Sequence, residues 1–303
     1  MLWRRILSLA VVIGLSGALT MPAWAADSPQ TRQLRVNGVD LSYLDQGTGT
    51  PVVFVHGAFS DLRFWEPQRQ AIAQQYRFVA YTYRYHGTAT WPDDGQHYAA
   101  ATHAADLAAF LRELHAEPVH LVAISYGGLV ATLMALEHPA LLRSLTLAEP
   151  GLGTLLADSP EGKAALDDRG KAMAAVGGAV KAGDAVQATK LFFAWVNNQG
   201  AGAFDKQPEA LRQMILENAR TVPLLLAAPA PPVVSCVTLG GLKVPTLVVG
   251  GAQTPRYFAL INEVVVQCLP GSRLVTIPNA THPMSFQHPA AFNEALLPFL
   301  AQH

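Results

Sequence analysis

The stretch Val119-His-Leu-Val-Ala-Ile-Ser-Tyr-Gly-Gly-Leu-Val-Ala131 decides the fold of this chain. An apolar run, broken only by His120, leads to Ser125, and a run of small residues then opens a helix. A strand, a polar residue and a helix with almost no loop between them hold the serine in a strained backbone conformation. The residues two positions to either side must be small because strand and helix nearly touch there, and Ala123 and Gly127 meet that demand.

A turn of this kind can make a serine nucleophilic. A serine hydroxyl attacks poorly unless an adjacent base takes its proton, and the turn lifts Oγ of Ser125 clear of the sheet, where a histidine can reach it. The N–H of Tyr126 and the start of the following helix then point at any oxyanion that develops. A tight junction that merely contains a serine is the alternative interpretation, because short motifs give false positives. The rest of the chain decides between the two.

Two further segments supply the remaining chemical groups. Pro51-Val-Val-Phe-Val-His-Gly-Ala-Phe59 indicates another buried strand, after which the N–H of Ala58 is placed as a second oxyanion donor. We interpret His56 as structural, with its ring bonded to the loop backbone. Near the C-terminus, His282 follows the short predicted strand Ser272–Pro278, on a loop where a general base is expected.

Taken together, these segments resemble the α/β-hydrolase superfamily, with the nucleophile before the histidine in the chain. The matching pieces are His56-Gly57, Tyr83-Arg-Tyr-His-Gly87, the turn around Ser125, Val244-Pro-Thr-Leu-Val-Val-Gly250 and Thr281-His282-Pro283. The resemblance implies that Ser125 is the nucleophile and His282 the base. It also implies that Ala58 and Tyr126 are the oxyanion donors. Ala123 is a mild departure from the family pattern, in which glycine is commoner at that position.

The acid of the expected triad departs further from the family pattern. Most relatives carry an aspartate shortly after the strand that matches Val244–Gly250, but the loop Gly251-Ala-Gln-Thr-Pro-Arg256 has no carboxylate. Glu263 is the next acid, and its helical setting predicts that it faces solvent. The strand Ser144–Ala148 instead leads directly into Glu149, which is similar to zearalenone-lactone hydrolases and haloalkane dehalogenases. We therefore favour Glu149, whose task would be to fix the histidine tautomer and stabilise the imidazolium.

Strands and helices alternate from Val52 to Pro150, which predicts an α/β fold with a doubly wound, mostly parallel sheet. The early strands are expected at Gln33–Tyr43, Val52–Val55 and Arg77–Tyr83, and a helix is expected at Ala99–Leu114. The predicted hydrolase core therefore comprises residues 26–150 and 233–303.

Residues 151–232 are predicted to form a helical cap inserted into that core. The alternation stops there, and alanine-rich segments predict helices at Glu161–Val180, Asp184–Asn197 and Pro208–Ala219, with Leu224–Pro232 returning the chain to the core. Helices above a strand-end crevice exclude water and shape a pocket. The candidate lining residues are Phe59, Trp65, Tyr126, Phe192, Phe193, Trp195 and Met214. The alternative for such aromatic residues on amphipathic helices is a place in the core.

The N-terminus has the features of a secretory signal peptide in residues 1–25. Met1-Leu-Trp-Arg-Arg5 is positively charged, Ile6–Leu19 is apolar, and Pro22-Ala-Trp-Ala25 provides a small-x-small cleavage site after Ala25. The apolar run is shorter than the ~18–20 residues of a membrane span, and no cysteine follows for a lipid anchor. The expectation is a periplasmic or secreted protein without a stable membrane anchor.

Charge and spacing argue against several other classes. The formal net charge is −1 and no basic stripe is visible, so nucleic-acid binding is not expected. The histidines lack the clustered spacing of metal ligands, and no cofactor is expected. Cys236 and Cys268 are the only cysteines. An oxidising compartment permits a disulfide between them, and two separate buried thiols are equally compatible with the sequence.

The sequence therefore predicts a secreted serine hydrolase that cleaves a hydrophobic, small-molecule carboxylic ester or lactone through an acyl-enzyme. Serine at the turn argues against haloalkane dehalogenase and epoxide hydrolase chemistry, which use a carboxylate nucleophile in this superfamily. Amide hydrolysis, C–C hydrolysis and perhydrolysis run on the same groups, and the fold does not separate them. The rival from another class is a non-catalytic binding protein of the same fold, which only the missing acid in the usual loop supports.

Overall fold

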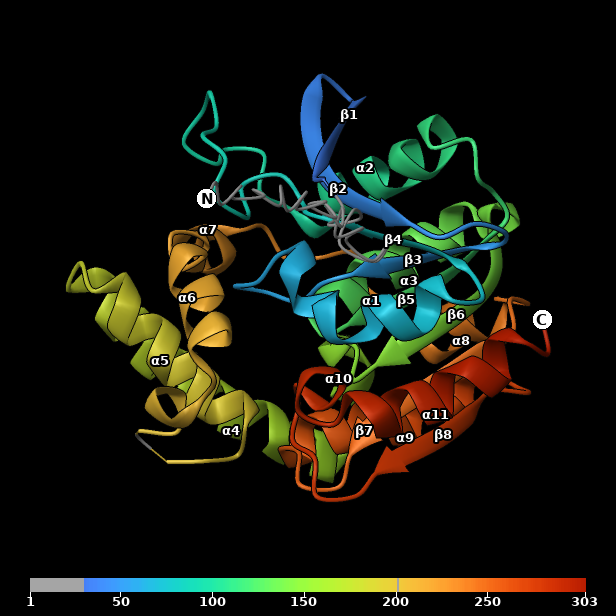
Figure 1. Ribbon diagram of the computed structural model, residues 1–303. Coiled ribbons are helices and arrows are strands. Elements are labelled where there is room, and N and C mark those ends of the chain that lie inside the picture. The colour runs from blue at the N-terminus through green and yellow to red at the C-terminus, as the bar shows by residue number, and fades with distance from the viewer. Residues whose placement is uncertain (1–29, 201) are drawn as a thin grey trace, which may run out of the picture. The chain divides into compact units, whose positions relative to one another are not determined.

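An eight-stranded sheet in the order β1-β2-β4-β3-β5-β6-β7-β8 runs through the computed structural model (Figure 1). In this order, each strand from β4 to β8 pairs in parallel with its neighbour. Strand β2 pairs antiparallel with both β1 and β4. The structure describes residues 30–200 and 202–303, so the predicted signal peptide lies outside the described residues. No helix within the described ranges has the length and apolar character needed to cross a membrane.

The bounds of the strands and helices agree closely with the predicted alternation. The strands are β1 Arg32–Val36, β2 Val39–Gln46, β3 Pro51–Val55, β4 Arg77–Tyr81, β5 Val119–Ile124, β6 Leu142–Ala148, β7 Thr246–Gly251 and β8 Arg273–Ile277. The helices outside the insertion are η2 Leu62–Trp65, α1 Glu66–Ala73, α2 Ala100–Glu113, α3 Tyr126–Glu137, η3 Pro139–Leu141, α8 Cys236–Gly240, α9 Arg256–Cys268, α10 Met284–Gln287 and α11 Pro289–Leu300. The predicted doubly wound, mostly parallel sheet with an inserted helical lid is confirmed.

Helices cover both faces of the sheet, and this explains the continuous apolar runs in its central strands. Val53 and Val55 of β3 belong to the apolar cluster under α2, α3 and α9. Val52 and Phe54 of the same strand belong to the opposite cluster, which includes residues of α1 and α11. Successive side chains of a strand point to opposite faces, so a strand covered on both sides has to be apolar at every position.

The predicted strand Gln33–Tyr43 is wrong, because this segment is a hairpin. β1 and β2 pair antiparallel on either side of Asn37 and Gly38, whose φ angles are +46° and +79°. A two-residue hairpin turn of this kind needs positive φ at both central residues, and Asn-Gly is the pair that adopts it at the lowest cost. The dipeptide was the available signal for the reversal, within a stretch that otherwise alternates like one strand.

The inserted lid comprises η4 Gly153–Leu156, α4 Pro160–Lys181, α5 Ala185–Val196, η5 Phe204–Lys206, α6 Glu209–Glu217 and α7 Thr221–Ala227, all between β6 and β7. Three of these helices lie within two residues of their predicted bounds. Helix α7 was not predicted, because the residues from Leu224 onward were assigned to the segment that returns the chain to the core; Pro223 lies inside this helix. It stands in the first turn, where the missing N–H costs nothing. Val222 of α7 packs with Val176 of α4 and Ala188 of α5.

Cys236 and Cys268 form a disulfide, which decides between the two alternatives that the sequence left open. It joins the first residue of α8 to the last residue of α9, with 4.9 Å between the Cα atoms. The bond therefore fixes the segment that returns from the lid to the core strand β7.

Removing this disulfide is expected to lower the free energy of unfolding by about 3–4 kcal/mol, because the closed loop restricts the unfolded chain. The two cysteines are 32 positions apart, a separation of intermediate length for this effect. The double variant Cys236→Ser and Cys268→Ser should show the loss in urea titrations. Wild-type protein with dithiothreitol should approach the same curve, and equal stability of oxidised and reduced protein would contradict the prediction.

Candidate active site

Ser125 lies in the sharp turn between β5 and α3 that the sequence predicted. Its φ and ψ are +57° and −122°, outside the regions that most L-residues occupy. A Cβ on Gly127 would lie 2.2 Å from the carbonyl oxygen of His56, so only glycine fits there. The carbonyl oxygen of Ser125 accepts from the N–H of Gly151 at 2.8 Å, which ties this turn to the one after β6.

Phe59 and Glu149 also have left-handed backbone conformations, with φ of +55° and +45°. Such residues cost about 1–3 kcal/mol each and concentrate at functional sites. Phe59 follows the predicted oxyanion donor Ala58, and Glu149 follows β6. The turns after β3, β5 and β6 are thus all strained at the residue that the sequence assigned to the site.

Glu149 and His282 are in direct contact. Nδ1 of His282 lies 2.6 Å from Oε2 of Glu149, whose side chain is fully buried. The ring of His282 stacks on Phe258, with 4.0 Å between centroids. The alternative acid Glu263 is exposed and pairs with Arg256 at 2.7 Å, as its predicted solvent-facing position requires. The structure therefore brings the favoured carboxylate to the histidine and leaves the other one at the surface.

The loop of residues 251–256, which lacks a carboxylate, supports the contact between Glu149 and His282 by donating hydrogen bonds. The N–H of Gly251 donates to Oε1 of Glu149 at 2.7 Å, and the hydroxyl of Thr254 donates to Oε2 at 2.7 Å. Sequence reasoning missed both groups, because it searched this loop only for an acid. Each oxygen of the buried carboxylate thus has a donor besides the histidine, which is what burial of a carboxylate requires.

Ser125 and His282 line one small pocket of about 60 Å³. Among the hydrogen bonds of the described residues, none joins the hydroxyl of Ser125 to the His282 ring. In unliganded enzymes such a contact is often long and tightens when the substrate binds. Glu149, His282 and Ser125 come from the ends of β6, β8 and β5, so the sheet places the three groups along one edge.

The two N–H groups expected to bind an oxyanion flank Ser125. The N–H of Tyr126 is in the first turn of α3, where no carbonyl within the helix can accept it. Ala58 lines the same small pocket as Ser125, and its N–H donates to no backbone carbonyl among the described residues. The hydroxyl of Tyr126 contacts Nδ1 of His103 at 2.8 Å, which anchors the ring away from its N–H.

His56 has the structural place that the sequence predicted. Its Nδ1 contacts the carbonyl oxygen of Gly57 at 2.8 Å, and its Nε2 accepts from the N–H of Tyr83 at 3.2 Å. A ring that donates through Nδ1 and accepts through Nε2 is neutral, and burial lowers the pKa of His56 to about 4. This ring braces the loop that carries Ala58.

Acid is expected to destabilise the fold through four buried histidines, His56, His86, His103 and His120, because burial lowers the pKa of each. Burial lowers the pKa of His56 to about 4, that of His103 to about 3 and that of His86 well below its usual value. Below pH 6.5 the unfolded chain binds protons that these rings cannot accept, so the free energy of unfolding falls with pH. The window runs from about pH 6.5 down to pH 4 for His56 and pH 3 for His103.

Urea titrations between pH 7.5 and 4.5 measure this loss, which is roughly 1 kcal/mol per pH unit for each histidine well inside the window. His56→Gln should flatten the dependence, whereas His97→Gln, at an exposed histidine, should leave it unchanged. A wild-type stability that stays constant over this range would refute the assignment.

The lining of the small pocket is mostly apolar and includes part of the predicted set. Phe59, Phe192 and Phe193 line it, together with Phe64, Val196, Leu211 and Ile215. Trp65 does not, because it packs in the core between Phe54 and Phe292, and its neighbour Phe64 in η2 faces the pocket instead. Met214 is also in the core, since Leu211 and Ile215 occupy the pocket-facing side of α6.

A second, wide pocket of about 330 Å³ also reaches Ser125 and Ala58. Tyr126, Phe192 and Trp195, all predicted pocket residues, line it, and Phe192 lines both pockets. The remaining walls come from Ala100, Leu129, Gly151, Arg169, Met173, Leu225, Leu226, residues 228–231, Tyr257 and Phe258. The nucleophile candidate therefore lies where a small and a wide pocket meet.

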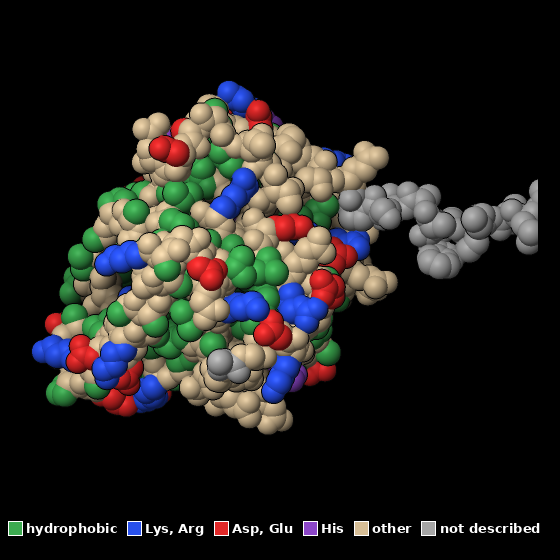
Figure 2. Space-filling view, turned by 90° about the vertical axis from the view of Figure 1, so that its left-hand side faces the viewer, with side chains coloured by type: hydrophobic (Ala, Val, Ile, Leu, Met, Phe, Trp, Pro, Cys, Tyr) green, Lys and Arg blue, Asp and Glu red, His purple; other side chains and the backbone are tan. Residues whose placement is uncertain are grey.

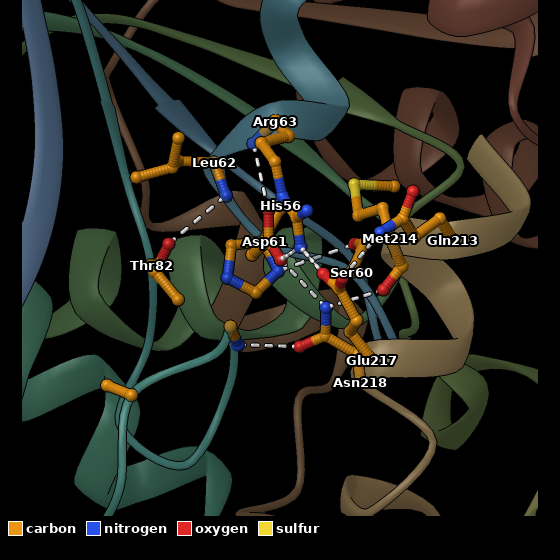
Figure 3. Close-up of polar contacts among 12 residues, drawn as sticks. His56, Ser60, Asp61, Leu62, Arg63, Thr82, Gln213, Met214, Glu217 and Asn218 are labelled. Atoms are coloured by element: carbon orange, nitrogen blue, oxygen red, sulfur yellow. Dashed lines mark hydrogen bonds and ion pairs between the residues drawn. The ribbon is translucent and has the colours of Figure 1, made fainter. Parts of the chain in front are cut away.

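Polar contacts connect the lid to the loop after β3 that carries Ala58 (Figure 3). Nδ2 of Asn218, just after α6, donates to Oδ2 of buried Asp61 at 2.8 Å, and its Oδ1 accepts from the N–H of Gly87 at 2.7 Å. Arg63 pairs with both Asp61 and Glu217 at 2.7 Å. Burial by itself raises the pKa of Asp61, but the hydrogen bonds and charge of Arg63 and the bond from Asn218 outweigh it and lower that pKa. This carboxylate therefore stays charged and holds the lid near Ala58.

Charged side chains of both signs are interspersed on the face that carries α5 and α6 (Figure 2). Within residues 30–200 and 202–303, no three His, Cys, Asp or Glu side chains gather in a group that could hold a metal ion. The predicted absence of cofactors and of nucleic-acid binding stays a prediction.

Comparison with known proteins places this site in a wider context. A sequence profile of the alpha/beta hydrolase family matches residues 52–295. The chain is similar to a putative non-heme bromoperoxidase of Mycobacterium tuberculosis, BpoC, with 26% identity over 87% of this chain and 98% of that protein. It is similar in structure to Est816, an N-acyl homoserine lactone degrading enzyme, with a TM-score of 0.71, 24% identity and coverage of 88% and 100%. It is also similar to a thermophilic esterase from Thermogutta terrifontis, with a TM-score of 0.69, 25% identity and coverage of 90% and 98%.

Proposed function

The chain belongs to the alpha/beta hydrolase family, and we propose that it is a serine hydrolase that cleaves a carboxylic ester or a lactone through an acyl-enzyme. The observation that carries the proposal is the contact of 2.6 Å between His282 and buried Glu149, in a site whose pocket His282 shares with Ser125. A carboxylate behind a histidine that faces a strained serine is the arrangement that nucleophilic catalysis by serine needs. Similarity to an esterase and to a lactone-degrading enzyme supports this choice of substrates.

In the proposed mechanism, Oγ of Ser125 attacks the carbonyl carbon while Nε2 of His282 takes its proton. Glu149 accepts the hydrogen bond from Nδ1 and stabilises the imidazolium that forms. The oxyanion receives hydrogen bonds from the N–H groups of Ala58 and Tyr126, and such a donor typically contributes about 10²–10³ in rate. The imidazolium then protonates the leaving oxygen, and water repeats the sequence to release the acid.

The apolar walls of the pockets support a hydrophobic substrate. Aromatic and aliphatic side chains from η2, α5 and α6 enclose the small pocket, and the lid helices keep bulk water from the reacting carbonyl. In a water-poor site, the hydrogen bonds to the oxyanion are stronger than in solution. Esters with long or aromatic groups should therefore be better substrates than short, charged ones.

Perhydrolysis is the second candidate, and the similarity to a putative non-heme bromoperoxidase favours it. Hydrogen peroxide would replace water in the attack on the acyl-enzyme and release a peracid. Measuring peracid formation with and without Ser125 tests this alternative on the same groups.

A fluorophosphonate probe tests the proposed nucleophile directly. Wild-type protein should be labelled at Ser125 within minutes, and peptide mapping should locate the adduct there. A screen of p-nitrophenyl esters of graded chain length, together with a set of lactones, then separates ester from lactone preference. A protein that resists the probe and hydrolyses none of these compounds would be the non-catalytic binding protein instead.

Export from the cytoplasm remains part of the proposal. It is supported by the charged, apolar and small-x-small segments of residues 1–25 and by the disulfide between Cys236 and Cys268, since disulfides persist in oxidising compartments. N-terminal sequencing of the protein from a periplasmic or culture fraction should begin at Ala26. An intact Met1 would contradict cleavage.

A further inference from the structure

We infer that the wide pocket binds a substrate group with an apolar body and an anionic end, and that Arg169 of α4 recognises the anion. This inference rests on the proposed function, because it assigns the substrate class of the same site. It adds an electrostatic determinant to a pocket that would otherwise select by shape and hydrophobicity alone. The group is identified by its chemistry, an alkyl or aryl chain that ends in a carboxylate.

The unequal volumes of the two pockets indicate a substrate with a small group on one side of the scissile bond and a larger group on the other. At about 60 Å³, the small pocket has room for roughly four water-sized groups, taking about 15 Å³ for each. The wide pocket is about 330 Å³ and opens from the same serine. One side of the scissile bond is therefore small, and the larger substituent extends between α4, α5, α9 and the segment 228–231.

Among the described residues that line the wide pocket, Arg169 is the only charged one. Its guanidinium carbon lies over the Tyr257 ring, 5.6 Å from the centroid, in a cation–π contact that holds the group beside the ring. No ion pair of the described residues includes Arg169, although nearby charges pair with each other: Asp168 with Lys171, and Glu161 with Arg256. A contact with a ring face uses none of the N–H groups of the guanidinium as hydrogen-bond donors to an anion, and a carboxylate is the partner that matches them.

The rest of the wall determines what the anion must be attached to. Leu129, Met173, Phe192, Trp195 and Phe258 provide an apolar surface in the same pocket that Ser125 and the arginine line. A free inorganic anion or a short polar acid would leave this surface in contact with water. A chain that covers it and ends at the guanidinium gains from both apolar burial and charge pairing.

Matched ester pairs test the inference with the full-length mature protein. Monomethyl suberate and methyl octanoate place the large group on the acyl side, whereas ω-acetoxyoctanoate and octyl acetate place it on the alcohol side. Hydrolysis is followed by titration of the released acid. In the pair that fits the site, Arg169→Gln should lower the ratio of kcat/KM between the anionic and the neutral ester at least tenfold, which corresponds to about 1.4 kcal/mol.

Further variants separate charge recognition from a structural role. Arg169→Lys should keep much of the anionic preference, and Lys163→Gln, which removes an exposed charge from the same helix, should leave the ratio unchanged. The neutral ester reports any general loss of activity in each variant, and the ratio of kcat/KM corrects for that loss. An unchanged ratio in Arg169→Gln, or an equal loss for both esters, would overturn the inference.

A binding measurement distinguishes failure of this inference from failure of the proposed function. Calorimetry should show that Arg169→Gln weakens octanoate binding at least tenfold and leaves octanol binding unchanged. Raising NaCl from 0.1 M to 1 M should weaken octanoate binding to the wild type only, because salt screens the guanidinium. If no ester is hydrolysed but octanoate behaves in this way, the proposed function fails and the anion site stands. Equal binding of octanoate by both proteins refutes the site.

Discussion

Ser125→Ala is expected to lower kcat for the best ester substrate by about 10⁴–10⁶, because the variant has no atom that can form the acyl-enzyme. The fold should survive the change. The residue keeps its place between β5 and α3, and its side chain makes no hydrogen bond to another described residue that the variant would lose. Initial rates at saturating substrate, with thermal unfolding measured in parallel, test the prediction.

Ser60→Ala is the matched control, because Ser60 lines the same small pocket and its hydroxyl contacts only its own loop, where it donates to the carbonyl oxygen of Gly57 at 3.1 Å and lies 3.4 Å from Nδ1 of His56. The Ser60→Ala variant should retain most of the activity, and its labelling by the fluorophosphonate should decrease only slightly. Residual turnover in Ser125→Ala would come from the oxyanion donors and from substrate positioning, which act without the hydroxyl. A variant that retained a tenth of wild-type kcat would remove Ser125 from the mechanism.

The turn around Ser125 was predictable because its constraints are local. A serine between a strand and a helix requires small neighbours, and those neighbours are visible in the sequence as Ala123 and Gly127. The contact between Glu149 and His282 was predictable for a different reason. Parallel strands bring their carboxyl ends to one edge of the sheet, so an acid directly after β6 and a histidine after β8 come together once the strand order is known.

Side-chain direction within short or amphipathic helices could not be predicted. In η2 the sequence offers both Phe64 and Trp65, and only the packing of the loop against the sheet decides that Phe64 faces the pocket. For the same reason, Met214 of α6 was predicted to line the pocket, whereas Leu211 and Ile215 line it in the structure. Hydrophobic periodicity shows which face of a helix is apolar, but it does not distinguish a core contact from a pocket wall.

Contacts between segments that are distant in the sequence could not be predicted either. Thr254 carries no charge and lies in a loop that matches the family's usual place for the acid, so nothing in the sequence connects it with Glu149. Arg169 is one of several charged residues on α4, and only the position of Tyr257 and of the wide pocket distinguishes it from its neighbours. The pairing of Cys236 with Cys268 is of the same kind, since spacing alone fixes no distance in space.

Glu149→Gln is expected to lower kcat by about 10⁴ with little change in fold, because the amide forces the wrong histidine tautomer. Oε1 of Glu149 accepts from the N–H of Gly251, so the amide oxygen of the variant has to face that donor. The amide NH₂ group then faces Nδ1 of His282, which must accept a hydrogen bond where it now donates one. The proton of the neutral imidazole moves to Nε2, and His282 can no longer take the proton of Ser125.

Thr254→Val provides the matched control for this prediction. It removes the second donor to Oε2 but leaves the carboxylate and its contact with His282 in place, so we expect a loss of only about 10-fold, the scale of one hydrogen bond to a charged group. The tautomer argument also predicts that activity of Glu149→Gln recovers in part at high pH, where hydroxide can replace the histidine as base. Kinetics between pH 6 and 10 for both variants measure this difference. If Glu149→Gln loses no more than Thr254→Val, the carboxylate does not set the tautomer of His282 and the proposed triad is wrong.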